Sequence, residues 1–374
     1  MTFKRTIFWT HLAVGVVTGL VVLFLSVTGI LLTYERQIVD ALEHDGASSG
    51  DPVLSADQLA DRASEITGGK ATGVVFLPDA QSPVTVKIGR RQAGLLDPYT
   101  GEELEGASVT REFFHTVTAL HRWLALEGAG REAAAAAIGA ANLAFLFMVI
   151  SGVYLWLPKR WNWRVLKMNS WFKGNYPNNK ARDYNWHHVI GIWCFVPLFF
   201  VICTAVVFSY SWANTMVYSF YGEEAPTRGG PRGTQAQKTD NVKPTFNGGL
   251  DLQALLVKAK THDNNWQRIT LLIPKENSSA VSFTVDTGTG GQPQKQTTIT
   301  LNRKLGELVN QNSFGDRSAG QQTRVIIRFL HTGEVLGLFG QTLAGLASLG
   351  ACFLVYTGLM LAYRRLLAPV LARR

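Results

Sequence analysis

Four histidines in this 374-residue sequence stand beside long apolar runs, in positions that repeat. His11 lies seventeen residues before Thr28, and His187 lies seventeen residues before Thr204, with a glycine four residues after each histidine. A polar ring at the edge of the hydrocarbon is costly and usually functional, so both imidazoles are candidate ligands. The offset favours His187 over its neighbour His188.

A second pair of histidines has its own repeat. His121 and His331 each follow a leucine, and each lies nine residues before a glycine that precedes a polar residue. The order of apolar span, outer α+β segment, histidine and apolar span therefore occurs twice, which predicts two pseudo-repeats. This duplication selects four of the eight histidines.

Two histidines from facing helices at one membrane depth are the axial ligands that a haem b iron requires, and bis-histidine ligation suits electron transfer. We expect His11 and His187 to lie near the cytoplasmic face, and His121 and His331 near the periplasmic face. The pattern predicts two haem b groups stacked through the bilayer. Three glycines are expected to let the porphyrin approach the backbone: Gly15, Gly19 and Gly191.

Other assignments compete with this one. A histidine at a membrane edge is often only a hydrated interfacial residue. A closed zinc or iron site needs more ligands, and the spans hold no Asp or Glu to supply them or to relay protons. His115 stands six residues before His121 and is an alternative ligand, and His188 is an alternative to His187.

The elements that must position these rings are four apolar runs, each long enough to cross a bilayer. The runs are roughly 7–32, 133–157, 189–212 and 342–362. The first is too long for an ordinary signal peptide, so we expect an uncleaved span. The fold class predicted is an α-helical membrane protein with four transmembrane helices in two pseudo-repeats and two small periplasmic α+β units.

Charge sets the expected orientation, because short cytoplasmic loops carry excess Lys and Arg. The two ends and the short loop after the second run hold 13 basic residues against one acid, Asp183, in a chain of net charge +9. We therefore expect a multi-pass membrane protein with both termini cytoplasmic. The basic residues are Lys4, Arg5, Lys159, Arg160, Arg164, Lys167, Lys173, Lys180, Arg182, Arg364, Arg365, Arg373 and Arg374. The basic pI is then a signal of topology and of membrane lipid, not of nucleic acid.

The predicted division of the chain has seven parts. They are span 1 (1–34), outer unit 1 (35–110), a histidine segment with span 2 (111–158), a basic loop (159–185), span 3 (186–213), a linker with outer unit 2 (214–325), and a histidine segment with span 4 and the tail (326–374). Outer unit 1 is expected to contain a helix at 55–67, strands at 72–77 and 83–88, and a turn at 97–102. Outer unit 2 repeats this order, with a helix at 250–262, strands at 269–274, 280–286 and 297–301, and a degenerate turn at 301–308.

Several motifs together resemble the PepSY-associated transmembrane family. They are the HxxxG openings at His11 and His187, Leu120-His121-Arg122-Trp123-Leu124, Leu330-His331-Thr332-Gly333, Ser151-Gly152, Thr357-Gly358 and Asp97-Pro98-Tyr99-Thr100-Gly101-Glu102. Within that family the chain looks most like ferric-siderophore reductases of bacterial inner membranes. The resemblance implies PepSY-like outer units, two b-type haems and axial ligation by His11, His187, His121 and His331, with His115 left open. The second outer unit departs from the motif, because Arg303-Lys304 replaces Pro-Tyr.

The function expected is one-electron reduction of a periplasmic ferric siderophore, of hydroxamate type, with release of Fe(II). No G-x-G-x-x-G fingerprint is present, so the electron donor must be external, on the cytoplasmic or membrane side. The expected substrate surface comprises Arg122, Trp123, Tyr210 and Tyr218. Two alternatives are a membrane b-type cytochrome that exchanges electrons with quinone or a periplasmic redox protein, and a non-redox PepSY protein that binds a peptidase.

Overall fold

A computed structural model of the chain describes residues 2–43, 53–89, 91–104, 107–158, 161–226, 249–275 and 278–371. The chain forms two compact units. The helical unit comprises 1–35, 114–217 and 327–374, and the sheet unit comprises 36–113 and 218–326. Each unit is therefore built from both halves of the chain. Within the part predicted as a linker with outer unit 2 (214–325), residues 227–248 lie outside the described residues.

Four long helices make up most of the helical unit: α1 Phe3–Leu32, α5 Gly128–Trp156, α7 Asn179–Ser209 and α11 Gly337–Leu366. A helix of this length extends about 45 Å, which exceeds the hydrocarbon thickness of a bilayer. Only 22% to 33% of the most apolar stretch of each span is buried within the protein, so most of its apolar side chains face outward, as lipid requires. The prediction of four candidate spans is confirmed, and the helices continue beyond the apolar runs at their polar ends.

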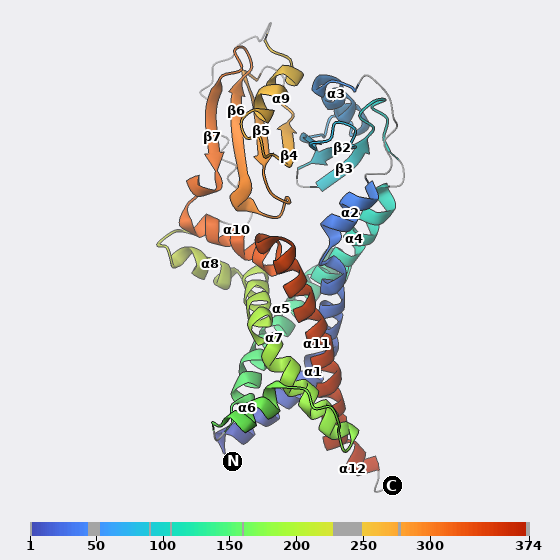
Figure 1. The fold of residues 1–374 in the computed structure, drawn as a ribbon, viewed down its shortest axis with the longest axis vertical. Coiled ribbons are helices and arrows are strands. Elements are labelled where there is room, and N and C mark those ends of the chain that lie inside the picture. The colour runs from blue at the N-terminus through green and yellow to red at the C-terminus, as the bar shows by residue number, and fades with distance from the viewer. Residues whose placement is uncertain are drawn as a thin grey trace. The chain divides into compact units, whose positions relative to one another are not determined.

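The four spans pack as a closed ring, because α1 contacts α5 and α11, and α7 contacts the same two helices. Both chain ends and the short helix α6 (Trp163–Ser170) lie at one end of this bundle (Figure 1). A chain that crosses the bundle four times has to begin and finish at the same end. The remaining short helices are α2 Glu35–Glu43, α4 Ala107–Trp123, α8 Ser211–Ser219, α10 Ala319–His331 and α12 Ala368–Leu371.

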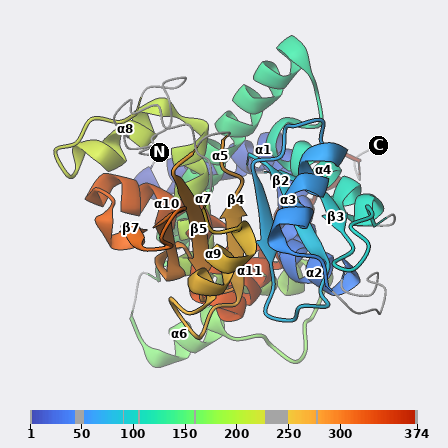
Figure 2. The same cartoon turned by 90° about the horizontal axis from the view of Figure 1, so that it is seen from above.

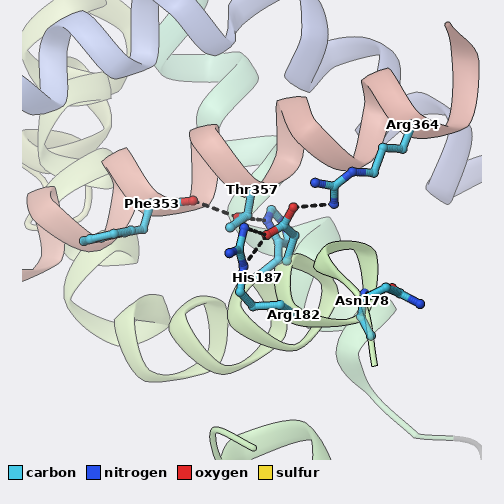
Figure 3. Close-up of polar contacts among 8 residues, drawn as sticks. Asn178, Arg182, His187, Phe353, Thr357 and Arg364 are labelled. Atoms are coloured by element: carbon cyan, nitrogen blue, oxygen red, sulfur yellow. Dashed lines mark hydrogen bonds and ion pairs between the residues drawn. The ribbon is translucent and has the colours of Figure 1, made fainter. Parts of the chain in front are cut away.

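Asp183 is completely buried between two arginines at the end of the bundle that holds the chain termini. Its Oδ1 accepts hydrogen bonds from Arg182 at 2.9 and 3.0 Å, and its Oδ2 accepts one from Arg364 on α11. Figure 3 shows both arginine side chains approaching this position from the two helices. A buried carboxylate needs such partners, so the ion pair fixes α7 against α11.

The sheet unit holds one antiparallel sheet of seven strands in the order β3-β2-β1-β4-β5-β6-β7. The strands are β1 Gly73–Phe76, β2 Val84–Ile88, β3 Arg91–Leu96, β4 Arg268–Leu272, β5 Ala280–Asp286, β6 Gln296–Asn302 and β7 Leu308–Ser313. Two helices, α3 Ala56–Ile66 and α9 Leu252–Lys260, lie over one face of this sheet (Figure 2). The two α+β segments expected from the sequence are therefore halves of one unit.

The join between the halves is the pairing of β1 with β4, which runs from Gly73 opposite Leu272 to Phe76 opposite Ile269. Apolar side chains from both halves enter one core beneath α3 and α9, including Val74, Val86 and Phe283, all fully buried. A half with three short strands and one helix buries too little apolar surface to be stable by itself, so the shared core explains the join.

The helices α3 and α9 cap each other. The Asp57 carboxylate of α3 accepts the backbone N–H groups of Leu252 and Gln253 at 2.9 and 3.0 Å, at the start of α9. In return, the Gln253 side chain of α9 accepts the N–H of Ala56 at 2.9 Å. These bonds satisfy donors that a helix start leaves unpaired, and they cross from one half to the other.

The turn after β3 and the turn after β6 have the same backbone. In the first, the Asp97 side chain accepts two N–H groups, and the Gly101 N–H returns to the Asp97 carbonyl at 2.9 Å. Asn302 and Gly306 make the same bonds in the second, and both glycines have positive φ, +70° and +67°. The substitution of Arg303-Lys304 for Pro-Tyr therefore leaves the turn intact, because the Asx residue and the glycine form it.

Replacing Asp57 with Ala should destabilise the sheet unit by about 1–3 kcal/mol, because two helix-start donors lose their acceptor. The apparent melting temperature of the full chain in detergent, followed by circular dichroism, measures the effect. Asp61→Ala is the matched control, since Asp61 is exposed one turn later on α3. Equal melting temperatures for both variants would show that the reciprocal caps contribute nothing.

Candidate functional site

The four histidines selected from the sequence make four equivalent hydrogen bonds inside the helical unit. Each ring uses Nδ1, and each partner is a buried hydroxyl on a long helix other than the one that carries the histidine. The bonds join His11 to Ser151 at 2.8 Å, His121 to Thr28 at 2.8 Å, His187 to Thr357 at 2.9 Å and His331 to Thr204 at 2.9 Å. The first and third pairs link α1 to α5 and α7 to α11. The second and fourth link α4 to α1 and α10 to α7.

The hydroxyl groups determine which ring nitrogen carries the proton. Thr357 donates its only hydroxyl proton to the Phe353 carbonyl at 2.7 Å, one turn earlier on α11 (Figure 3). It can therefore only accept from His187, so Nδ1 is the protonated nitrogen. Thr28, Thr204 and Ser151 also donate to carbonyls of their own helices. His331 Nδ1 lies 3.0 Å from the Val201 carbonyl as well, which has no proton to give.

In the neutral form of each ring, the lone pair therefore lies on Nε2. Ligating histidines typically donate their other ring N–H to a fixed acceptor, which sets both tautomer and orientation. Burial, followed by the charge of His331, lowers the pKa of His121 on α4 to about 4. That ring is therefore neutral at pH 7, which is the state that binds a metal.

The structure brings the rings together as two pairs. The centres of the His121 and His331 rings are 6.5 Å apart. A metal ion about 2 Å from one nitrogen of each ring would fit between two rings at this separation. His11 and His187 bond to α5 and α11, and each of these helices contacts both α1 and α7. The residues present therefore fit a bis-histidine haem at the His121–His331 pair, and His11 with His187 provides the same two donors.

The glycines beside these rings are not the ones expected. A side chain at Gly19 would contact Val355 and Leu359, and one at Gly191 would contact Leu354, so both glycines serve helix packing. The glycines near imidazoles directly follow the hydroxyl residues. They are Gly29, Gly152 and Gly358. A Cβ atom added to any of these glycines would lie 3.3 to 3.7 Å from a histidine Cε1.

The two alternative histidines have different surroundings. His188 Nδ1 bonds to the Tyr184 carbonyl of its own helix at 2.9 Å, and its ring lies 4.1 Å from the Tyr184 ring. His115 is exposed on α4. A shift of six residues turns a helix by about 240°, so His115 faces away from the direction of His121. Neither ring shares the hydroxyl contact.

The four residues expected at a substrate surface come from three elements: Arg122 and Trp123 from α4, Tyr210 from the C-cap of α7, and Tyr218 from α8. Arg122 lies over the Trp123 ring at 4.8 Å, whereas the Tyr210 hydroxyl packs against Gly139 of α5. Tyr218 belongs to the sheet unit and is only 6% exposed.

The sequence did not reveal that four hydroxyl groups orient the histidines. All four hydroxyl residues nevertheless belong to the repeated offsets or motifs found in the sequence, and they are Thr28, Ser151, Thr204 and Thr357. Their signal was the small pair Thr-Gly or Ser-Gly inside a span at three of the four positions. Within the described ranges, no group of three or more His, Cys, Asp or Glu side chains converges on one point.

If the His121 ring ligates haem, replacing Thr28 with Val should weaken that binding by about 10- to 100-fold, because the acceptor that holds the ring is lost. Titration of purified protein with limiting haem, followed by absorbance, measures the affinity. Thr18→Val is the matched control on the same helix, since Thr18 bonds only to the Val14 carbonyl. If the two variants bind haem alike, the hydroxyl does not orient the ring.

Comparison with known proteins adds a family assignment. The family model described as the PepSY-associated TM region matches residues 8–365. No curated protein matches the sequence significantly. Because the match covers nearly the whole chain and the helical unit has four candidate spans, the chain belongs to the PepSY-associated transmembrane family.

Proposed function

We propose that this protein is a haem-dependent oxidoreductase of the bacterial inner membrane that reduces a periplasmic ferric siderophore. The observation that carries the proposal is the set of four Nδ1–hydroxyl bonds, which leave four Nε2 lone pairs free in two pairs of rings. Four imidazoles whose Nδ1 atoms already donate to hydroxyl groups suit metal ligation through Nε2 better than proton transfer.

His11 and His187 would hold one haem b, and His121 and His331 the other. Bound in this way, the two groups would supply one-electron transfer between the ends of the bundle. The protein's own residues hold the ring tautomers and surround the path with apolar side chains that exclude water. We place both chain ends in the cytoplasm and the sheet unit in the periplasm, because the Lys and Arg residues concentrate at the end with the termini.

The proposed substrate explains why no acid–base residues are needed. Fe(III) is a hard cation that hydroxamate oxygens hold tightly, whereas Fe(II) is held far less tightly. One electron converts the Fe(III) chelate to Fe(II) and the free chelator, with no proton transfer required of the protein. The electron comes from an external donor on the cytoplasmic or membrane side. The two-half organisation of both units supports the inference that the chain arose by internal duplication.

A second candidate is a membrane cytochrome that exchanges electrons with quinone. It is favoured by an aromatic pocket of about 370 Å³ lined by Trp171, Phe172, Val189 and Trp193, beside His188 on α7. A flat apolar ring suits such a lining. Reoxidation of the reduced protein by ferric siderophores and by quinones, compared at equal driving force, separates the two functions.

Replacing His11 or His187 with Ala should reduce the haem content from near two to near one per chain, and so should replacing His121 or His331. Pyridine haemochrome analysis of purified protein measures this content. His115→Ala and His188→Ala are the matched controls and should retain both haems. Colourless wild-type protein, obtained from cells supplied with iron and δ-aminolevulinate, would refute the proposed function and favour a non-redox PepSY protein.

A further inference from the structure

Two arginines converge on one indole next to His121. The guanidinium carbon of Arg122 lies 4.8 Å from the centre of the Trp123 ring, and that of Arg131 lies 4.2 Å from the same centre. The indole face stabilises each cation. It does not remove the repulsion between them, and among the described residues no carboxylate forms an ion pair with either arginine.

The helix ends increase this positive potential. Arg131 lies in the first turn of α5, which begins at Gly128, and the side chain of the N-cap residue Glu127 makes no capping hydrogen bond there. The start of a helix carries partial positive charge, so a cation there is unfavourable unless an anion is also present. The site therefore combines two guanidinium groups and a helix start. All three favour the same kind of ligand, an anion.

The backbone that places these arginines is strained. Leu124 and Ala125, which connect α4 to α5, both have φ of +54°, a left-handed conformation that non-glycine residues rarely adopt. Consecutive residues of this kind persist only where the surroundings require them, and they are frequent at ligand-binding sites. The short connection between α4 and α5 places Arg131 over the Trp123 ring.

We propose that Arg122 and Arg131 bind the two propionate carboxylates of the haem held by His121 and His331. This inference rests on the proposed function. Arginine forms paired hydrogen bonds with carboxylates, and a porphyrin edge offers two of them. Arg122 follows His121 directly in the chain, so the carboxylate site and the axial ligand come from one helix end. The arginines thereby act as binding residues for the cofactor and not for the ferric chelate.

The test is a redox titration of both haems in Arg122→Gln, Arg131→Gln and the double variant. A nearby cation favours the ferrous state, so its removal should lower the midpoint potential of the haem at His121 and His331 alone. At the wild-type midpoint, the ratio of reduced to oxidised haem should fall about tenfold in the double variant, which corresponds to about 59 mV for one electron. The His11→Ala background, which retains only this haem, identifies the affected transition.

Three further measurements make the test specific. Arg122→Lys keeps the charge but loses the paired hydrogen bonds, so the potential should stay near the wild-type value while haem loss to apomyoglobin becomes faster. Arg317→Gln, which removes an arginine from the Phe314 ring in the sheet unit, should change neither property. Unchanged potentials in the double variant would overturn the inference, and so would an equal shift of both haems.

The outcomes also separate this inference from the proposed function. Wild-type protein without haem would refute the function itself. Wild-type protein with two haems, and a double variant with the same potentials but weaker binding of an anionic ferric chelate, would assign the arginines to the substrate and overturn the inference alone.

Discussion

Each of four buried hydroxyl groups in the helical unit has only one proton to donate, and this limit determines how the histidine rings are held. Inside a span, a threonine or serine hydroxyl donates to a carbonyl one turn earlier, because no water is available to accept the proton. The oxygen then retains only acceptor capacity, and an imidazole N–H from another helix uses it. The helix backbone thus specifies the tautomer of a ring on a neighbouring element. Ring orientation is established by helix packing, before any ligand binds.

In the sheet unit, polar groups are exchanged between the two halves of the chain. Strands β1 and β4 pair at the centre of the sheet, and α3 and α9 accept each other's N–H groups through Asp57 and Gln253. In the helical unit, by contrast, each of the four histidine–hydroxyl bonds joins two elements of the same half. In the sheet unit, a polar group of one half satisfies a group that the other half leaves unpaired. Neither half can complete its hydrogen bonds alone, so the two halves are expected to be stable only together.

The two halves differ most in their charged groups. Asp183 lies one turn before His187 and pairs with Arg364 on α11, whereas the position four residues before His11 is Ile7. The buried carboxylate neutralises the cations beside it. At the α4–α5 connection, Arg122 and Arg131 share the Trp123 ring without a carboxylate partner among the described residues. The charges around Asp183 are therefore paired within the protein, whereas the Arg122–Arg131 pair is suited to binding an added anion.

The sequence by itself determined the elements whose signal is local. Apolar length predicted the four spans, the N-cap serine at position 55 and the apolar spacing predicted α3, and the repeated offsets singled out His11 and His187. It did not reveal β7, because Leu308–Ser313 reads LVNQNS and lacks the alternation of a half-buried strand. The hydroxyl partners of the histidines lie 93 to 170 residues away along the chain. Only the tertiary structure decided those pairs, together with the join of β1 to β4 and the meeting of two arginines on Trp123. Each depends on which faces of distant elements pack together, and a residue pattern along one element does not contain that information.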